Sequence, residues 1–318
     1  MKYDLDRCTH TREAYGDALI GEAKRNRDIV VIDGDVSNST KTDRFAREFP
    51  DRFINVGIAE QNMVNIAAGL AHSGKIPFVS TFPVFGCGRA WEQIRNTVAL
   101  DSLNVKLVMT HAGLSLGGDG ATHQGLEDIA IMRVIPNMEV IVPADGAEVK
   151  AVIRHTVANR GPVYIRLSRR RSIVLFDDDY RYDPREYPVI RDGDDVAVFA
   201  SGCMIREALI AAESLAKAGI SARVIDMHTV KPLPRDCVLA HARETGRVVS
   251  VEEHNVLGGA GSALAELLAE EYPAPMRLVG VRDRFGRSGQ VDALFDLLGI
   301  SSRYISEAVQ ILIRTERS

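Results

Sequence analysis

The chain has 318 residues, 46% hydrophobic and 26% charged, a composition typical of a soluble globular protein of about two domains. The formal net charge of −4 argues against nucleic acid or an anionic membrane as the main partner. The start MKYDLDRCTH lacks the apolar run of a signal peptide, and no segment approaches the roughly 20 apolar residues of a membrane span, so we expect a cytoplasmic protein.

Short β-branched runs alternate with helical segments along the chain. We expect strands buried on both faces at residues 28–36, 76–82, 104–112, 138–144 and 162–168, and again at 195–202, 222–227, 247–254 and 276–283. The acidic, proline-containing stretch LFDDDYRYDPREYPVI between the two groups favours an exposed linker. The sequence therefore predicts an α/β protein of two domains, each a mainly parallel sheet flanked by helices, with boundaries at 1–175, 176–190 and 191–318.

A glutamate stands at the start of a predicted buried helix in VGIAEQNMVNIAAGLA. The helix is apolar nearly all round, and Glu60 lies in its first turn. The simplest explanation is a favourable interaction with the helix dipole, worth roughly 0.3–1 kcal/mol. A carboxylate that is partly desolvated at such a place can also share a proton with a ring nitrogen of a ligand.

Three motifs point to a family. The glutamate helix is followed by STFPVFG and by THAGLSLGGDGATHQGLEDIAIMRVIPNMEVIVPAD, and together they resemble the pyrimidine-binding domain of transketolase. The segments FASGCMIREAL, VIDMHTVKPL and VSVEEHNVLGGAGSALAE resemble the transketolase C-terminal domain. The resemblance covers almost the whole chain, with the motifs in the expected order, and implies thiamine diphosphate as the cofactor.

The resemblance assigns a role to the glutamate. In this family a glutamate on this helix binds the aminopyrimidine ring of thiamine diphosphate, while aromatic side chains pack on that ring. The matching cofactor-binding positions are Glu60, Phe82, Phe85, Ile58 and Val36. Ordinary core packing is the alternative for the two phenylalanines. A third aromatic position of the family falls on Gly88, so one wall of the pocket is missing or is supplied from elsewhere.

The glycine-rich segment HAGLSLGGDGATHQ lies between a strand and a helix, where α/β proteins bind ligands. Family positions that bind the sugar or its phosphate match Arg12, Ser37, His111, Asp119, His123 and Arg169. Of these, His111 and His123 join Glu60 as candidate catalytic residues. His123 could act as a proton shuttle, because a free imidazole titrates near neutrality. A surface histidine without a role is the alternative for both.

The magnesium motif of thiamine-diphosphate enzymes is not recognisable here. That motif is G-D-G followed about 25–30 residues later by asparagine, and it holds the Mg²⁺ that neutralises the diphosphate. Gly118-Asp119-Gly120 has no such asparagine, and the DGD at 33–35 does not fit the motif. We therefore expect no metal site in this chain and a partner subunit that holds Mg²⁺.

The sequence thus predicts the beta-type, pyrimidine-binding subunit of a split transketolase, which transfers a two-carbon ketol unit from a phosphorylated ketose to an aldose. The expected assembly is α2β2, with self-association through both domains, and we expect His254 to cap a helix or lie at an interface. Three alternatives remain open: a 1-deoxyxylulose-5-phosphate synthase-like protein, a 2-oxo acid dehydrogenase beta subunit, and a non-catalytic subunit. Pentose phosphates, branched-chain sugar phosphates and sulfonated ketoses all remain candidate substrates.

Overall fold

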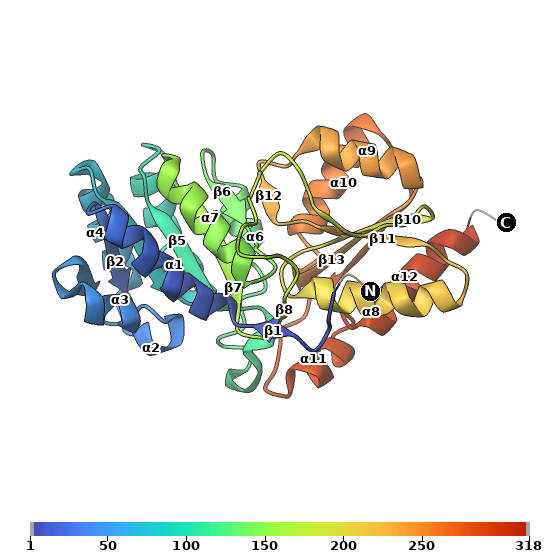
Figure 1. The fold of residues 1–318 in the computed structure, drawn as a ribbon, viewed down its shortest axis with the longest axis horizontal. Coiled ribbons are helices and arrows are strands. Elements are labelled where there is room, and N and C mark those ends of the chain that lie inside the picture. The colour runs from blue at the N-terminus through green and yellow to red at the C-terminus, as the bar shows by residue number, and fades with distance from the viewer. Residues whose placement is uncertain (1–2, 316–318) are drawn as a thin grey trace.

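The strands predicted from the sequence are all present, and they form two mainly parallel sheets that lie side by side (Figure 1). The computed structural model describes residues 3–315. The prediction of an α/β protein with two helix-flanked sheets is therefore confirmed. No helix in this part of the chain is both long and apolar enough to cross a membrane.

The first sheet has the strand order β12-β6-β7-β5-β4-β2-β3, and all its strands except β12 run parallel. Its strands are β2 (Ile29–Asp33), β3 (Phe53–Asn55), β4 (Ile76–Thr81), β5 (Lys106–Ala112), β6 (Glu139–Ile141), β7 (Val163–Ser168) and β12 (Thr229–Lys231). The helices that accompany it are α1 (Thr11–Arg25), α2 (Ser37–Thr40), α3 (Asp43–Glu48), α4 (Glu60–His72), α5 (Trp91–Gln93), α6 (Asp128–Arg133) and α7 (Gly146–Ala158).

The second sheet has the order β14-β13-β10-β11-β9, with only β9 antiparallel. Its strands are β9 (Val189–Arg191), β10 (Val196–Ala200), β11 (Ala222–Asp226), β13 (Val248–Asn255) and β14 (Met276–Val281). Its helices are α8 (Met204–Lys217), α9 (Arg235–Thr245), α10 (Ala260–Glu271), α11 (Val291–Leu297) and α12 (Ser302–Thr315). We call residues up to 175 the first half and residues from 191 the C-terminal half. A short antiparallel pair, β1 (Cys8–Thr9) with β8 (Ser172–Ile173), joins distant parts of the first half.

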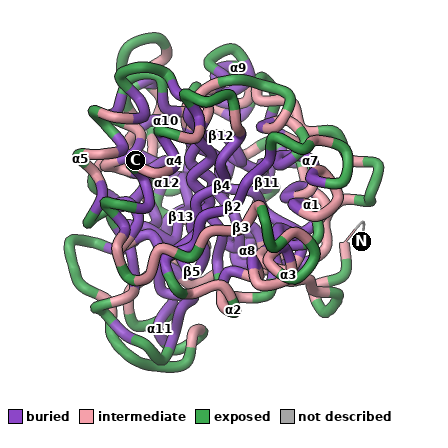
Figure 2. The backbone as a smooth tube through the Cα atoms, turned by 90° about the vertical axis from the view of Figure 1, so that its left-hand side faces the viewer, coloured by how far each residue is buried: buried purple, intermediate pink, exposed green. Residues whose placement is uncertain are grey.

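Most sheet strands are buried (Figure 2), because helices cover both faces of each sheet, and their side chains are mainly apolar. In β2, Val31 packs in the cluster that contains residues of α1 and α7, while its neighbour Ile32 packs with Met63 of α4 on the other face. The predicted all-round burial of α4 is wrong in part. Ile66 and Leu70 are only half-buried, because the side of the helix that carries its asparagines and glutamine is exposed.

The segment expected to be an exposed linker is partly packed. Tyr187 is 4% exposed, and its hydroxyl donates to the carbonyl oxygen of Thr229. The hydroxyl groups of Tyr182 and Thr229 are 2.7 Å apart. Tyrosines can bury their rings while their hydroxyl groups find partners, so an acidic composition did not keep this segment in solvent. The boundaries at 175 and 190 stay predictions, and β9 spans the second of them.

Two acidic side chains are buried where the halves meet. Glu148 of α7 accepts hydrogen bonds from the Ala144 amide at 2.7 Å and from the Tyr180 hydroxyl at 2.9 Å. Burial raises the pKa of Glu148 to about 7. Burial and the adjacent Glu148 charge raise the pKa of Asp226, at the end of β11, well above its usual range.

Candidate active site

The predicted site residues gather at the carboxyl ends of parallel strands in the first sheet. Phe82 directly follows β4, His111 is near the end of β5, and Arg169 directly follows β7. Carboxyl ends of parallel strands share one edge of a sheet, which is the usual ligand-binding edge of α/β proteins. This edge therefore holds residues that are far apart in the sequence.

Four of the predicted side chains form one cluster of rings. The Phe82 ring lies 6.1 Å from that of Phe85 at an angle of 24°, and 4.3 Å from the imidazole of His111. The centre of the His123 imidazole lies 5.2 Å from that of the Phe85 ring, and the two ring planes are at 84°. The structure thus brings together the aromatic pair matched to the cofactor and the two histidines matched to the substrate.

Glu60 is the first residue of α4 and is only 1% exposed. Its Oε2 accepts a hydrogen bond from Nη1 of Arg89 at 2.7 Å, and the guanidinium carbon of Arg89 lies 5.1 Å from the centre of the Phe85 ring. Arg89 ends a π-helix at Val84–Arg89 that also carries Phe85. Such π-helical turns are rare and occur frequently at functional sites. The guanidinium therefore connects the buried carboxylate to the aromatic pair.

The backbone of His111 has φ +66°, the left-handed region that a side chain other than glycine seldom adopts. Its Nδ1 lies 2.7 Å from the hydroxyl of Thr110, and its Nε2 lies 3.4 Å from Nη1 of Arg12. Because a guanidinium can only donate, Nε2 accepts from Arg12 and the ring proton is on Nδ1. Burial and the nearby positive charges of Arg12, Arg169 and Lys41 lower the pKa of His111 to about 3, so the imidazole is neutral.

Positive charge is concentrated around this histidine. Arg12 donates to the Ser39 carbonyl oxygen at 3.1 Å, yet its buried Nε has no hydrogen-bond partner among residues 3–315. Burial and the neighbouring Arg169 charge lower the pKa of Arg12. A buried donor without a partner is costly, and several cations around it favour an anionic ligand.

The loop after β2 is held by a carboxylate that the sequence analysis missed. Asp33 is fully buried and accepts from the Val36 amide at 2.7 Å, from the Thr40 hydroxyl at 2.9 Å and from the Thr42 hydroxyl at 2.8 Å. These bonds fix the turn of chain that carries Ser37. The polar run DVSNSTKT was the available signal, because such residues often bind their own backbone in turns.

The glycine-rich loop carries the other predicted residues. Arg169 donates to the Leu116 carbonyl oxygen at 2.8 Å, and its Nη1 lies 3.9 Å from Oδ2 of Asp119. Asp119 is exposed, and the Nδ1 of His123 lies 2.9 Å from the Thr122 hydroxyl. The arrangement combines solvent-accessible polar groups with the buried, neutral His111.

Three predicted positions have a weaker relation to this cluster. Ile58 is 76% exposed, while Val36 and Ser37 are half-buried. Their assigned roles stay predictions. At Gly88, where an aromatic residue was expected, an added Cβ would have no neighbour within 4 Å, so the chain leaves this side of the site open.

The residues present fit a planar ligand with an N–H donor. Arg89 is a flat cationic donor that already lies between the carboxylate of Glu60 and the ring of Phe85. An aminopyrimidine ring has the same two properties, since it is flat and its protonated ring nitrogen can donate to a carboxylate. Half of the Arg89 side chain is exposed, so it can move aside at little cost in burial.

Comparisons with known proteins agree with this chemistry. Residues 8–172 match the family model of the transketolase pyrimidine-binding domain, and residues 186–305 match that of the transketolase C-terminal domain. The chain is 42% identical to a 6-deoxy-6-sulfo-D-fructose transketolase subunit of Clostridium sp. strain MSTE9, covering 93% of this chain and 92% of that protein. It is 35% identical to an apulose-4-phosphate transketolase subunit of Phocaeicola vulgatus, covering 92% and 94% respectively.

A solved structure is also similar over nearly the full length of both chains. It is described as a split-gene transketolase in an inactive β4 tetramer, and it is 48% identical to this chain. The TM-score is 0.87, with 96% of this chain and 98% of that chain covered.

Proposed function

This chain belongs to the transketolase family as the pyrimidine-binding and C-terminal subunit of a split transketolase, and we propose that it moves a two-carbon ketol unit from an anionic ketose to an aldose. It is a transferase that works with a partner subunit. The relatives described above are transketolase subunits, which favours this function over the synthase-like, dehydrogenase and non-catalytic alternatives.

The observation that carries the proposal is the buried Glu60 carboxylate beside an aromatic pair. Thiamine diphosphate, when bound, supplies the carbon centre that accepts the ketol unit and stabilises its negative charge. Glu60 holds a proton at the ring nitrogen of the aminopyrimidine, and Phe82 and Phe85 exclude water from that hydrogen bond. Ile58 and Val36 complete the contact surface.

The positively charged part of the site binds the anionic end of the sugar. Arg12 and Arg169 offer planar donor groups that suit phosphate or sulfonate oxygens. When Arg12 turns to the anion, Nε2 of the neutral His111 can accept a hydrogen bond from a hydroxyl group of the ligand. Ser37 adds a hydroxyl donor. Asp119 and His123 contact the sugar hydroxyl groups. His123 also acts as a proton shuttle for these hydroxyl groups.

The partner subunit completes the cofactor site. We propose that it holds Mg²⁺ and the diphosphate, and that two copies of each chain form an α2β2 assembly. The open side at Gly88 supports this arrangement, since one wall of the pocket is left for another chain to supply. The related structure, whose β4 tetramer is described as inactive, also supports a need for the partner.

The purified chain alone is expected to show negligible binding of thiamine diphosphate with Mg²⁺ by calorimetry. The diphosphate is multiply charged, and its desolvation requires a metal site that we assign to the partner. Addition of the partner subunit should produce binding at about micromolar Kd or tighter, equivalent to roughly −8 kcal/mol.

The control for this experiment is the partner subunit alone, titrated with the same Mg²⁺ and thiamine diphosphate solutions. Tight binding or ketol transfer by the highly purified single chain would show that it is not half of an enzyme.

Arg169→Ala is expected to raise the KM for a phosphorylated ketose about 10- to 100-fold in the reconstituted enzyme, because a charge-assisted hydrogen bond is lost. The KM for the matching unphosphorylated ketose should change much less. Arg181→Ala, at an exposed arginine in the segment between the halves, is the matched control. Equal effects of Arg169→Ala on both donors would argue against an anion site here.

A further inference from the structure

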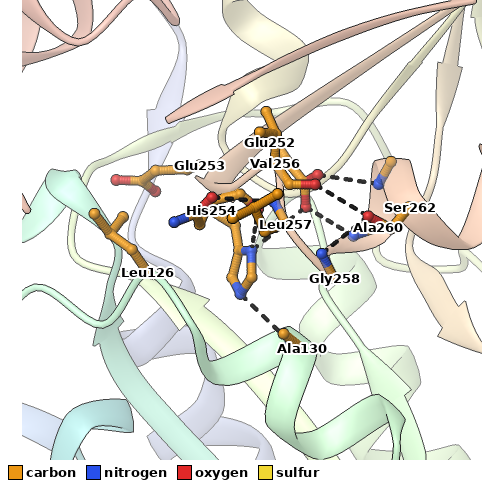
Figure 3. A network of polar contacts seen from close by, with 12 residues as sticks. Leu126, Ala130, Glu252, Glu253, His254, Val256, Leu257, Gly258, Ala260 and Ser262 are labelled. Atoms are coloured by element: carbon orange, nitrogen blue, oxygen red, sulfur yellow. Dashed lines mark hydrogen bonds and ion pairs between the residues drawn. The ribbon is translucent and has the colours of Figure 1, made fainter. Parts of the chain in front are cut away.

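Two neighbouring glutamates of β13 are both buried, and they point in opposite directions (Figure 3). Glu252 faces the start of α10, where its carboxylate accepts from the amides of Ala260 at 2.7 Å and Gly261 at 3.0 Å. Glu253 faces away from α10 (Figure 3). Glu252 therefore caps α10 of its own domain, and Glu253 does not.

Glu253 binds the glycine-rich loop of the first half. Its Oε1 accepts a hydrogen bond from the backbone amide of Ser115, and its Oε2 accepts from the thiol of Cys203 at 3.2 Å. Gly113 has φ +71°, and a Cβ placed there would lie 2.5 Å from the carboxyl carbon of Glu253. The loop can approach this carboxylate so closely because residue 113 is glycine.

The same loop is held at its other end by a second segment of the C-terminal half. The side-chain amide of Gln124 donates to the carbonyl oxygens of Gly117 at 3.3 Å and Arg287 at 3.1 Å. A Cβ at Gly286 would lie 1.8 Å from Oε1 of Gln124, so the two segments are in close contact. The loop is thus attached to the C-terminal half before and after its exposed residues.

The surface beneath the loop is fixed by buried polar contacts. Arg166 of β7 donates to the Glu253 carbonyl oxygen at 2.9 Å and, through Nε, to Oδ2 of Asp128 at 2.7 Å. The Ala130 amide of α6 donates to Nε2 of the fully buried His254 at 3.4 Å (Figure 3). This contact agrees with the expected helix-capping role of His254, and its expected place at an interface between subunits stays a prediction. The strand that carries Glu253 is therefore held to β7 and α6 of the first sheet's domain by these hydrogen bonds.

We propose that Glu253 is a positioning residue of the substrate site, through which the C-terminal half fixes the loop that carries Asp119 and His123. This inference rests on the proposed function in placing those two residues against the sugar. Glu253 lies behind the loop and itself contacts no reacting group. The C-terminal half then takes part in substrate recognition as well as in assembly.

The direct test is amide hydrogen exchange in the full chain without its partner. Glu253→Ala is expected to raise the exchange rate of peptides that cover residues 113–120 about tenfold or more, because the Ser115 amide loses its acceptor. Glu253→Gln keeps an acceptor oxygen and should restore slow exchange. Glu252→Ala is the matched control, and it should raise exchange at residues 258–262 instead.

Gln124→Ala provides an independent variant that leaves Glu253 in place, and it should raise exchange at residues 117–121. Unchanged exchange at residues 113–120 in Glu253→Ala, or an equal rise throughout the chain, would overturn the inference. The inference is also overturned if Glu253→Ala does not fold and Gln124→Ala leaves the loop protected.

Kinetics of the reconstituted enzyme provide the second measurement. Glu253→Ala should raise the KM for the ketose by about an order of magnitude with a smaller change in kcat, while Glu252→Ala keeps the wild-type KM. A fall in kcat alone would contradict a positioning role. A third outcome separates the two proposals. If Glu253→Ala exchanges faster in the loop but the reconstituted wild-type protein shows no ketol transfer, Glu253 still orders the loop and the proposed function is rejected.

Discussion

Glu60→Gln in the reconstituted enzyme is expected to lower kcat by a factor of about 10² to 10⁴. Glutamine has nearly the same shape but cannot take up or release a proton, so it cannot hold the proton at the ring nitrogen of the cofactor. Assembly should be unaffected, because the ion-pair partner of Glu60, Arg89, is half-exposed and lies in the same part of the chain. Steady-state kinetics with sedimentation of the same sample would measure both properties.

The control for this variant is Arg89→Ala. It removes the 2.7 Å ion pair with Glu60 but leaves the carboxylate in place. We expect a much smaller fall in kcat and a change mainly in cofactor affinity, since the guanidinium must give up its place to the ring. If Arg89→Ala were as inactive as Glu60→Gln, the ion pair would be the essential feature. Wild-type turnover in Glu60→Gln would reject the assignment of Glu60.

The free energy of unfolding is expected to fall by roughly 3 kcal/mol between pH 4.5 and pH 7 through Glu148, because one pKa unit corresponds to about 1.4 kcal/mol. The pKa of Glu148 is about 7 in the folded chain against an ordinary value of 4.5. In this window the folded chain keeps a proton that the unfolded chain has released. The contribution of Glu148 to the free energy of unfolding is thus fully present below pH 4.5 and is lost as the pH rises through 7.

Asp226→Asn tests the origin of this pH dependence. The amide cannot ionise and can donate to the neighbouring Glu148 carboxylate, so Glu148 should ionise at a lower pH. Denaturant unfolding at pH 5 and pH 8 should therefore differ less in the variant than in the wild type. Asp101→Asn, at an exposed aspartate, is the control. An unchanged difference between the two pH values would exclude the buried pair as the cause.

The sequence predicted most of the sheet strands because they are buried on both faces. Runs such as IVVID in β2 and VYIRLS in β7 are continuous, apolar and rich in β-branched residues. The sheet strands β3, β9 and β12 were missed. Each has three residues, of which at least one is not buried, so none of them shows a pattern distinct from a loop.

The site was predictable where sequence motifs carry its residues, and the resemblance supplied their roles. Phe82 and Phe85 of one motif do meet His111 and His123 of another. The contact between Glu60 and Arg89 could not be read from the sequence, because the two residues are 29 positions apart in different helices. The same holds for Ser115 and Glu253, which are 138 positions apart. Such contacts depend on how the helices and sheets pack.

The strand β12 ties the two halves together in a way that affects any attempt to recombine them. Thr229 and Lys231 pair with β6 of the first sheet, and the Val142 amide donates to the His228 carbonyl oxygen at 2.7 Å. A chain cut within residues 176–190 would leave β6 as an open edge, whose free amides and carbonyls can pair with other molecules. A chimera that exchanges C-terminal domains between relatives also replaces one strand of the recipient's first sheet. Such grafts must therefore match β12 to its new neighbour as carefully as they match the interface between subunits.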